Sequence, residues 1–244
     1  HPGYSLFIKT LGEFKVWRGP VEIKTKEWSR DKARKLLQIL VAHRGQFIRS
    51  EQLVDWLWPD KSREQGKQNL KVIINALNRI LEPERQGHTP YFIERNTQGY
   101  GLIDFNKFFV DADLFEARVQ LGLKYYQQNK LELAREVLEE AVSIYEGDYL
   151  PEMGYEEWAP LDQEAMRRLY MDAAGRLAEI YFQTKEWTKC LAVCEEILNK
   201  DSCWENAYQL MIMCYCQMKE KILAVQTFQR CKENLAKHLS VKPS

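Results

Sequence analysis

The spacing of hydrophobic residues divides the chain into a part with β-strands and a part that is helical throughout. Residues 4–28 alternate between apolar and polar side chains, which predicts short strands. From residue 29 the apolar positions follow a helical period, and three helices and a hairpin are expected before the purely helical part begins. The pattern predicts an α+β domain at residues 1–106 and an all-α domain at residues 107–244.

Three consecutive stretches of the first part carry the signals that begin and end helices. The first expected helix has an apolar face and ends at the sequence HRGQ, residues 43–46. The second begins at Ser50, a residue type favoured at the N-cap, and stops before Pro59. Ser62 and Gln65 have the spacing of a capping box, so the third helix is expected to begin there.

The third expected helix has an apolar side and an outer side that lacks acidic residues. Its core-facing positions are Leu70, Ile74, Leu77 and Leu81. Its outer side carries Gln68, Val72, Asn75 and Arg79, and the nearby cations are Lys67 and Lys71. Because a solvated helix face usually mixes glutamate with lysine, this composition suggests a partner other than water.

The sequence YFIERNTQGYGLID predicts a β-hairpin directly after the third helix. The residues at its tip are Arg95, Asn96, Thr97 and Gln98. Strands, three helices and a hairpin in this order are the layout of a winged helix, which places its third helix in the major groove of DNA. In this interpretation the amides contact base edges, Lys67 and Lys71 contact phosphates, and Arg95 enters the minor groove. The alternatives are a solvated helix face and a generic α+β domain without a nucleic-acid partner.

The helical part contains an internal repeat. The segment that begins at Tyr181 aligns with the segment that begins at Tyr215, an offset of 34 residues, which is the period of a tetratricopeptide helix pair. A third copy, around Tyr125, lies 56 residues before the second, so that about 22 residues are inserted between them. We therefore expect a tetratricopeptide-like domain of three stacked helix pairs, with an irregular helical bundle as the alternative.

A formal net charge of zero hides a basic first part and an acidic second part. Residues 1–104 contain 18 Lys and Arg against 12 Asp and Glu, and the remaining residues contain 17 against 23. All six cysteines lie in the last 55 residues without metal-site spacing, which predicts reduced core cysteines in a cytoplasmic protein. No apolar run is long enough to span a membrane, and no phosphate-binding loop or nucleophile motif indicates an enzyme. The sequence therefore predicts no cofactor, no metal and no membrane partner.

Several motifs resemble a known family. VAHRGQFIRSEQLVDWLWPD, NLKVIINALNRILEP and IERNTQGYGL closely resemble the OmpR-type winged-helix effector domain. DADLFEA, YEGDYLPE and YEEWAPLDQEAMRRLY resemble the bacterial transcriptional activation domain that follows it, and the whole chain resembles SARP-type activators. Similar modules also end longer regulators that carry an ATPase. The resemblance implies a transcription activator that binds double-stranded promoter DNA, with copies side by side on tandem repeats, and that recruits RNA polymerase.

The resemblance also assigns roles to individual positions. The expected phosphate or base contacts are Trp58, Gln68, Val72, Asn75, Asn78, Arg95 and the wing aromatic Tyr100. The expected polymerase contacts lie in the segment PDKSREQG and are Asp60, Lys61, Arg63 and Glu64.

Trp28, Trp56 and Trp58 are expected in the core, although Trp58 could instead donate its indole N–H to a phosphate. The alternative function is a protein-interaction or signal-receiving repeat module whose winged helix contacts protein.

Overall fold

The chain forms two compact units in a computed structural model. The model describes residues 2–28, 30–85, 87, 89–153, 160–238 and 241. One unit consists of His1–Asp113 with Gly147–Gln163, and the other of Leu114–Glu146 with Glu164–Ser244. The division thus falls a few residues later than the expected limit at residue 106, and the first unit also takes in a segment that the sequence had assigned to the helical part.

A four-stranded sheet opens the first unit. Its strands are β1 (Leu6–Lys9), β2 (Lys15–Arg18), β3 (Val21–Glu22) and β6 (Phe108–Val110), in the order β3-β2-β1-β6. β1 pairs antiparallel with β2 and parallel with β6. The expected alternation is confirmed over β1 to β3, but Thr25–Glu27 form a 3-10 turn where the pattern had predicted strand. The short strand β6 was not predicted.

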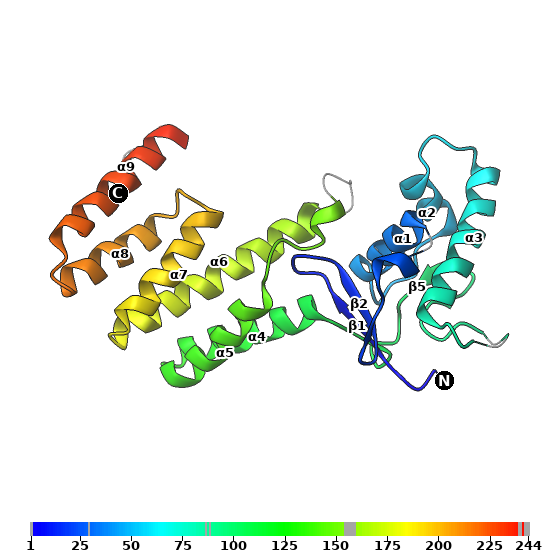
Figure 1. Cartoon of the computed structure of the whole chain (residues 1–244), viewed down its shortest axis with the longest axis horizontal. Coiled ribbons are helices and arrows are strands. Elements are labelled where there is room, and N and C mark those ends of the chain that lie inside the picture. Colours follow the sequence, from blue (N-terminus) through cyan, green and yellow to red (C-terminus); the bar gives the residue numbers. More distant parts are fainter. Residues whose placement is uncertain are drawn as a thin grey trace. The chain divides into compact units, whose positions relative to one another are not determined.

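Three helices follow the sheet (Figure 1): α1 (Asp31–Ala42), α2 (Ser50–Leu57) and α3 (Arg63–Leu81). Ser62 is the N-cap of α3, and its hydroxyl accepts a hydrogen bond from the Gln65 backbone N–H at 3.5 Å, as the capping spacing predicted. The N-cap assignment of Ser50 was wrong, because Ser50 is the first helical residue and Arg49 precedes it without a side-chain cap. The expected core tryptophans Trp28, Trp56 and Trp58 are only half-buried.

Asp111 joins the end of β1 to the start of α4 (Asp111–Gln127). Its side chain is buried and accepts four hydrogen bonds, from the Thr10 N–H at 2.7 Å, the Thr10 hydroxyl at 2.6 Å, the Leu11 N–H at 3.0 Å and the Ala112 N–H at 2.9 Å. A carboxylate at a helix N-terminus also complements the helix dipole. The first acidic residue of the motif DADLFEA is therefore a structural anchor.

The second unit is built from helix pairs. Its helices are α4, α5 (Leu131–Ile144), α6 (Pro160–Gln183), α7 (Trp187–Lys200), α8 (Glu205–Gln217) and α9 (Lys221–His238) (Figure 1). A 3-10 turn at Pro151–Met153, which belongs to the first unit, precedes α6 in the chain. Four of the six cysteines are buried in this part, as predicted, whereas Cys203 is half-buried and Cys216 is exposed. Residues 154–159, which include the whole sequence YEEW, lie outside the described residues.

The same turn connects the two helices of each pair, which confirms the repeat that the sequence predicted. Asn129, Lys185 and Lys219 have positive φ angles of 58°, 65° and 65°. The N–H of the residue after each of them donates to a tyrosine carbonyl five residues earlier, at 2.8 to 3.0 Å, and these tyrosines are Tyr125, Tyr181 and Tyr215. This is the Schellman helix end. Its recurrence has the offsets of 56 and 34 residues that the sequence showed.

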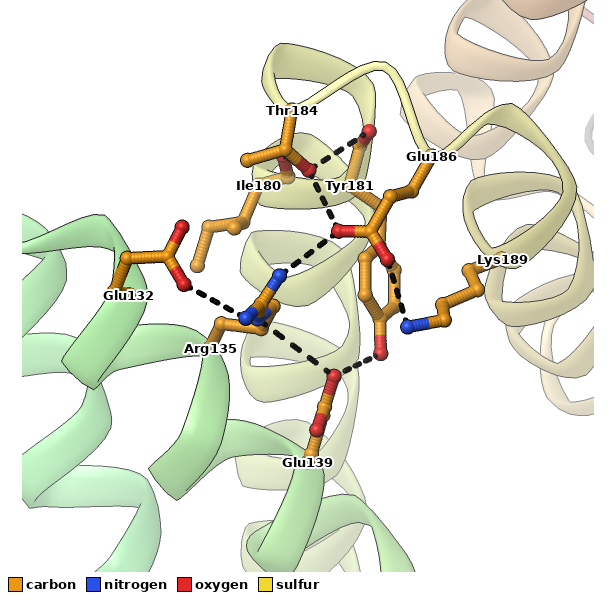
Figure 2. A network of polar contacts seen from close by, with 8 residues as sticks. All are labelled: Glu132, Arg135, Glu139, Ile180, Tyr181, Thr184, Glu186 and Lys189. Carbon is orange, nitrogen blue, oxygen red and sulfur yellow. Dashed lines mark hydrogen bonds and ion pairs between the residues drawn. The ribbon is translucent and has the colours of Figure 1, made fainter.

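A polar network joins the first helix pair to the second (Figure 2). Arg135 of α5 pairs with Glu132 at 2.7 Å and with Glu186, just before α7, at 3.0 Å. Tyr181 of α6 donates its hydroxyl to Glu139 of α5 at 2.6 Å. Burial and this hydrogen bond raise the pKa of Tyr181 above its ordinary value, so the phenol stays protonated and continues to donate. These contacts fix the register of the two pairs.

Two glycines on the first helices of these pairs have different surroundings. A Cβ added at Gly122 of α4 would lie 2.6 Å from Leu138, so close helix packing requires glycine there. A Cβ added at Gly175 of α6 would meet nothing within 4 Å. Glycine inside a helix costs about 1 kcal/mol relative to alanine. Packing within the chain does not explain Gly175.

Candidate nucleic-acid interface

Helix α3 is held rigidly by the rest of the first unit. Its apolar side is buried against α1 and α2, and Gly66 allows close approach to Val54 of α2. Its C-terminal carbonyls, which have no partner within the helix, are bound from the sheet side. Arg18 donates to the Ile80 carbonyl at 3.0 Å, and Tyr4 donates to the Leu81 carbonyl at 2.6 Å. The outer side of α3 therefore has a fixed orientation.

The outer side of α3 is exposed along the helix, as the sequence predicted. Its exposed residues are Gln68, Lys71, Val72, Asn75 and Arg79, with Ala76 half-buried beside them. Within the described part of the chain, none of the polar members of this set has a hydrogen bond or an ion pair. Arginines elsewhere are engaged, such as Arg44 with Asp113 at 2.8 Å and Arg230 with Glu195 at 2.8 Å. The polar side chains of α3 remain available to a partner.

Two of the residues predicted to contact DNA do not present a free side chain on the outer side of α3. Asn78 is only 2% exposed, because it lies four residues after Ile74 and three before Leu81, on the core-facing edge of α3. Its side chain does not belong to the outer face. Lys67 is exposed but pairs with Glu51 of α2 at 2.6 Å, and its ammonium holds the pKa of that carboxyl below the ordinary value.

The predicted hairpin is present beside α3. Its strands are β4 (Glu94–Arg95) and β5 (Tyr100–Gly101), which pair antiparallel. Asn96 forms the turn, because its side-chain oxygen accepts from the N–H groups of Gln98 at 2.8 Å and Gly99 at 3.0 Å. The tip residues Arg95, Asn96, Thr97 and Gln98 are all exposed.

Tyr100 is a buried residue of this hairpin and supports it. Its ring is buried, and the Arg95 guanidinium lies over it at 5.5 Å. Its backbone exchanges hydrogen bonds with Ile48 at 2.9 and 3.0 Å, so the hairpin extends onto the segment before α2. A side chain at Gly101 would collide with the Gln46 carbonyl, so this position requires glycine. Tyr100 orients Arg95 and does not itself lie at the surface.

Two basic hollows flank α3. One lies between α3 and the hairpin and is lined by Lys71, Asn75, Arg85, Arg95 and Lys107 among others. The other lies on the opposite flank and is lined by Arg18, Arg30, Asn75 and Arg79 among others. No periodic signal in the sequence connects Arg30, Arg85 or Lys107 to α3, so these residues were not predicted to belong to this surface. Lys107 pairs with Glu94 at 2.9 Å and Arg18 pairs with Glu27 at 2.5 Å, so part of the positive charge of these flanks is neutralised within the chain.

The expected polymerase segment is divided between a turn and a helix. Asp60 and Lys61 lie in the turn after α2, whereas Arg63 and Glu64 belong to the first turn of α3. All four side chains are exposed. Trp58 precedes them at the C-cap of α2, and its indole N–H has no hydrogen-bond partner among the residues that the model describes.

Within the described ranges, no three His, Cys, Asp or Glu side chains come together in a way that could hold a metal ion. No helix in these ranges combines the length and the apolar character that crossing a bilayer requires.

Comparisons with known proteins identify two family models. The model described as bacterial transcriptional activator domain matches residues 110–244, and the model described as transcriptional regulatory protein, C terminal, matches residues 25–102. No curated protein matches.

Two solved structures resemble the chain. The structure of Mycobacterium tuberculosis EmbR in complex with a low affinity phosphopeptide matches with a TM-score of 0.82 and 19% identity, over 99% of this chain. The chain spans 62% of the length of that EmbR chain. The TPR2B-domain:pHsp70-complex of yeast Sti1 matches with a TM-score of 0.37 and 16% identity, over 52% of this chain and 85% of that one. The EmbR match shows that the fold is a winged helix followed by a helical activator domain.

Proposed function

The chain belongs to the bacterial transcriptional activator domain family and is a SARP-type transcription regulator, and we propose that it binds double-stranded promoter DNA through α3 and the β4–β5 hairpin. The observation that carries this proposal is the outer face of α3. It is exposed, has no acidic residue, and offers amide and cationic side chains that no other described residue engages. Such groups contact base edges and phosphates in the major groove.

The roles of the individual residues follow from their positions. In this proposal Asn75 and Gln68 contact adenine edges, Arg79 contacts guanine or phosphate, and Val72 packs on a thymine methyl group. Lys71 contacts phosphate, and Arg95 at the hairpin enters the minor groove.

The remaining parts of the surface would contact phosphates or protein. The Trp58 indole N–H adds a phosphate contact next to α3. The exposed side chains of Asp60, Lys61, Arg63 and Glu64 contact RNA polymerase, and this contact makes the protein an activator.

Selection from a pool of random duplexes tests the proposal. We expect sequences that contain an A/T-rich half-site to be enriched, since the readout face is rich in amides. If two copies bind side by side, the half-sites recur at a spacing of about 10–11 base pairs. Failure of any sequence to be enriched over the starting pool would contradict specific DNA binding.

A further inference from the structure

The second unit has a shallow groove that the proposed DNA binding does not use. Two adjoining hollows share Asp172 and Arg176 of α6. One hollow reaches α4 at Leu123, Tyr126 and Gln127. The other reaches the start of α8 at Trp204, Asn206 and Leu210. The groove therefore crosses α6 from the first helix of the first pair to the first helix of the third.

Gly175 forms the floor of this groove. It lies between Asp172 and Glu179 on the same face of α6, at helical spacings of three and four residues. It lines the hollow next to α8, and a Cβ at this position would meet no atom within 4 Å. A glycine inside a helix is unfavourable, and no residue that the structure describes packs closely enough to require it. Close approach of another molecule to the helix backbone is a physical use of glycine that fits this position.

The charges in the groove are unevenly balanced. Arg176 donates to both carboxylate oxygens of Glu179, at 2.9 and 2.8 Å, and lies 5.4 Å above the Tyr126 ring. Tyr126 also donates its hydroxyl to Glu179 at 2.7 Å. Arg176 and Glu179 therefore neutralise each other's charge. Asp172 is exposed and has no ion pair with any residue that the model describes, so the groove retains one uncompensated negative charge.

Trp204 lines the same hollow as this carboxylate. Its side chain is half-buried, and its ring packs on no other aromatic ring in the described part of the chain. An indole face next to a carboxylate recognises the cationic end of lysine or arginine. The hollow has a volume of about 50 Å³, which accommodates the end of one long side chain and is far below the roughly 300 Å³ of a small-molecule site.

We propose that this groove binds an extended basic segment of a partner protein. One lysine or arginine side chain of the segment lies between Trp204 and Asp172, and its backbone passes over Gly175. The negative charge of the groove matches the positive charge of the segment. This interaction is independent of DNA binding by the first unit, and it gives the helical repeats a partner of their own.

A fluorescence anisotropy titration of the full chain tests this proposal. The probes are two labelled nine-residue peptides, one with alternating Lys and Ala and one with alternating Glu and Ala. We expect the lysine peptide to bind, and Gly175→Leu, Asp172→Asn and Trp204→Ala to weaken its binding about tenfold or more. The charge control is Glu136→Gln, which removes one exposed carboxylate from α5 and should leave binding unchanged.

Thermal unfolding of the same variants separates loss of binding from loss of folding. Gly175→Leu and Gly175→Ala should melt at or above the wild-type temperature, because the space is open and both residues favour a helix. Lysine-peptide binding that survives Gly175→Leu and Asp172→Asn, or that falls equally in Glu136→Gln, would overturn the proposal. Self-association of the chain that Gly175→Leu abolishes would assign the groove to a second copy instead and would also overturn it.

Discussion

Replacing Asp111 with alanine is expected to lower the free energy of unfolding of the first unit by about 3–5 kcal/mol. The buried carboxylate accepts hydrogen bonds from Thr10, Leu11 and Ala112, and three of the four donors are backbone N–H groups. The alanine variant leaves these donors inside the protein without an acceptor. Because small domains are stable by only about 5–15 kcal/mol, the loss is a large fraction of the total.

Urea unfolding followed by tryptophan fluorescence measures this effect. Asp111→Asn keeps the shape and one acceptor oxygen, and it should fall between wild type and Asp111→Ala. The matched control is Asp55→Ala on the exposed side of α2, which should change the free energy of unfolding by no more than about 0.5 kcal/mol. An unfolding midpoint of Asp111→Ala equal to that of wild type would show that the carboxylate is not the anchor of α4.

Replacing Arg79 with alanine is expected to weaken binding to a selected duplex by about 10- to 100-fold and to relax the preference at one base position. Arg79 is exposed in the last turn of α3, and no described residue neutralises its charge. Asn75→Ala should likewise relax sequence preference. Lys71→Ala should instead weaken binding to all sequences alike. It should also reduce the slope of log affinity against log salt concentration by about one.

Two further variants control for charge and for placement. Arg168→Ala removes an exposed arginine from α6 in the second unit and should leave DNA affinity unchanged. Asn78→Ala should have little effect on base preference, because the Asn78 side chain is buried. Equal losses for Arg79→Ala and Arg168→Ala would mean that only overall charge matters, and the assignment of α3 as the reading helix would then be wrong.

Periodicity predicted the parts of this fold that repeat locally. The apolar stripe of α3, the hairpin with its tip at residues 95–98 and the 34-residue offset between helix pairs all depend on residues close in sequence, and the structure has each of them. The strand β6 was missed because its pairing partner β1 lies about 100 residues earlier. The role of Asp111 was missed for the same reason, since its acceptor atoms face Thr10 and Leu11.

In the candidate site, too, the sequence predicted residues that follow local spacing and missed those that long-range packing brings together. Helical spacing placed Gln68, Asn75 and Arg79 on the exposed face correctly. The family position of Asn78 suggested a DNA contact, but its packing next to Ile74 and Leu81 buries it. The flanking cations Arg30 and Arg85 come from other segments, and only the folded chain brings them beside α3.

A salt-dependent titration of the full chain against duplex DNA tests the central claim most directly. With Lys71, Arg79 and Arg95 as phosphate-neutralising cations, about three counterions are released. Affinity should therefore fall roughly 40-fold between about 50 mM and 200 mM salt. The result predicted is measurable binding at low salt with this steep decline. Absence of binding to any duplex at 50 mM salt, or an affinity that does not change with salt, would contradict the assignment of α3 and the hairpin as a DNA-binding surface.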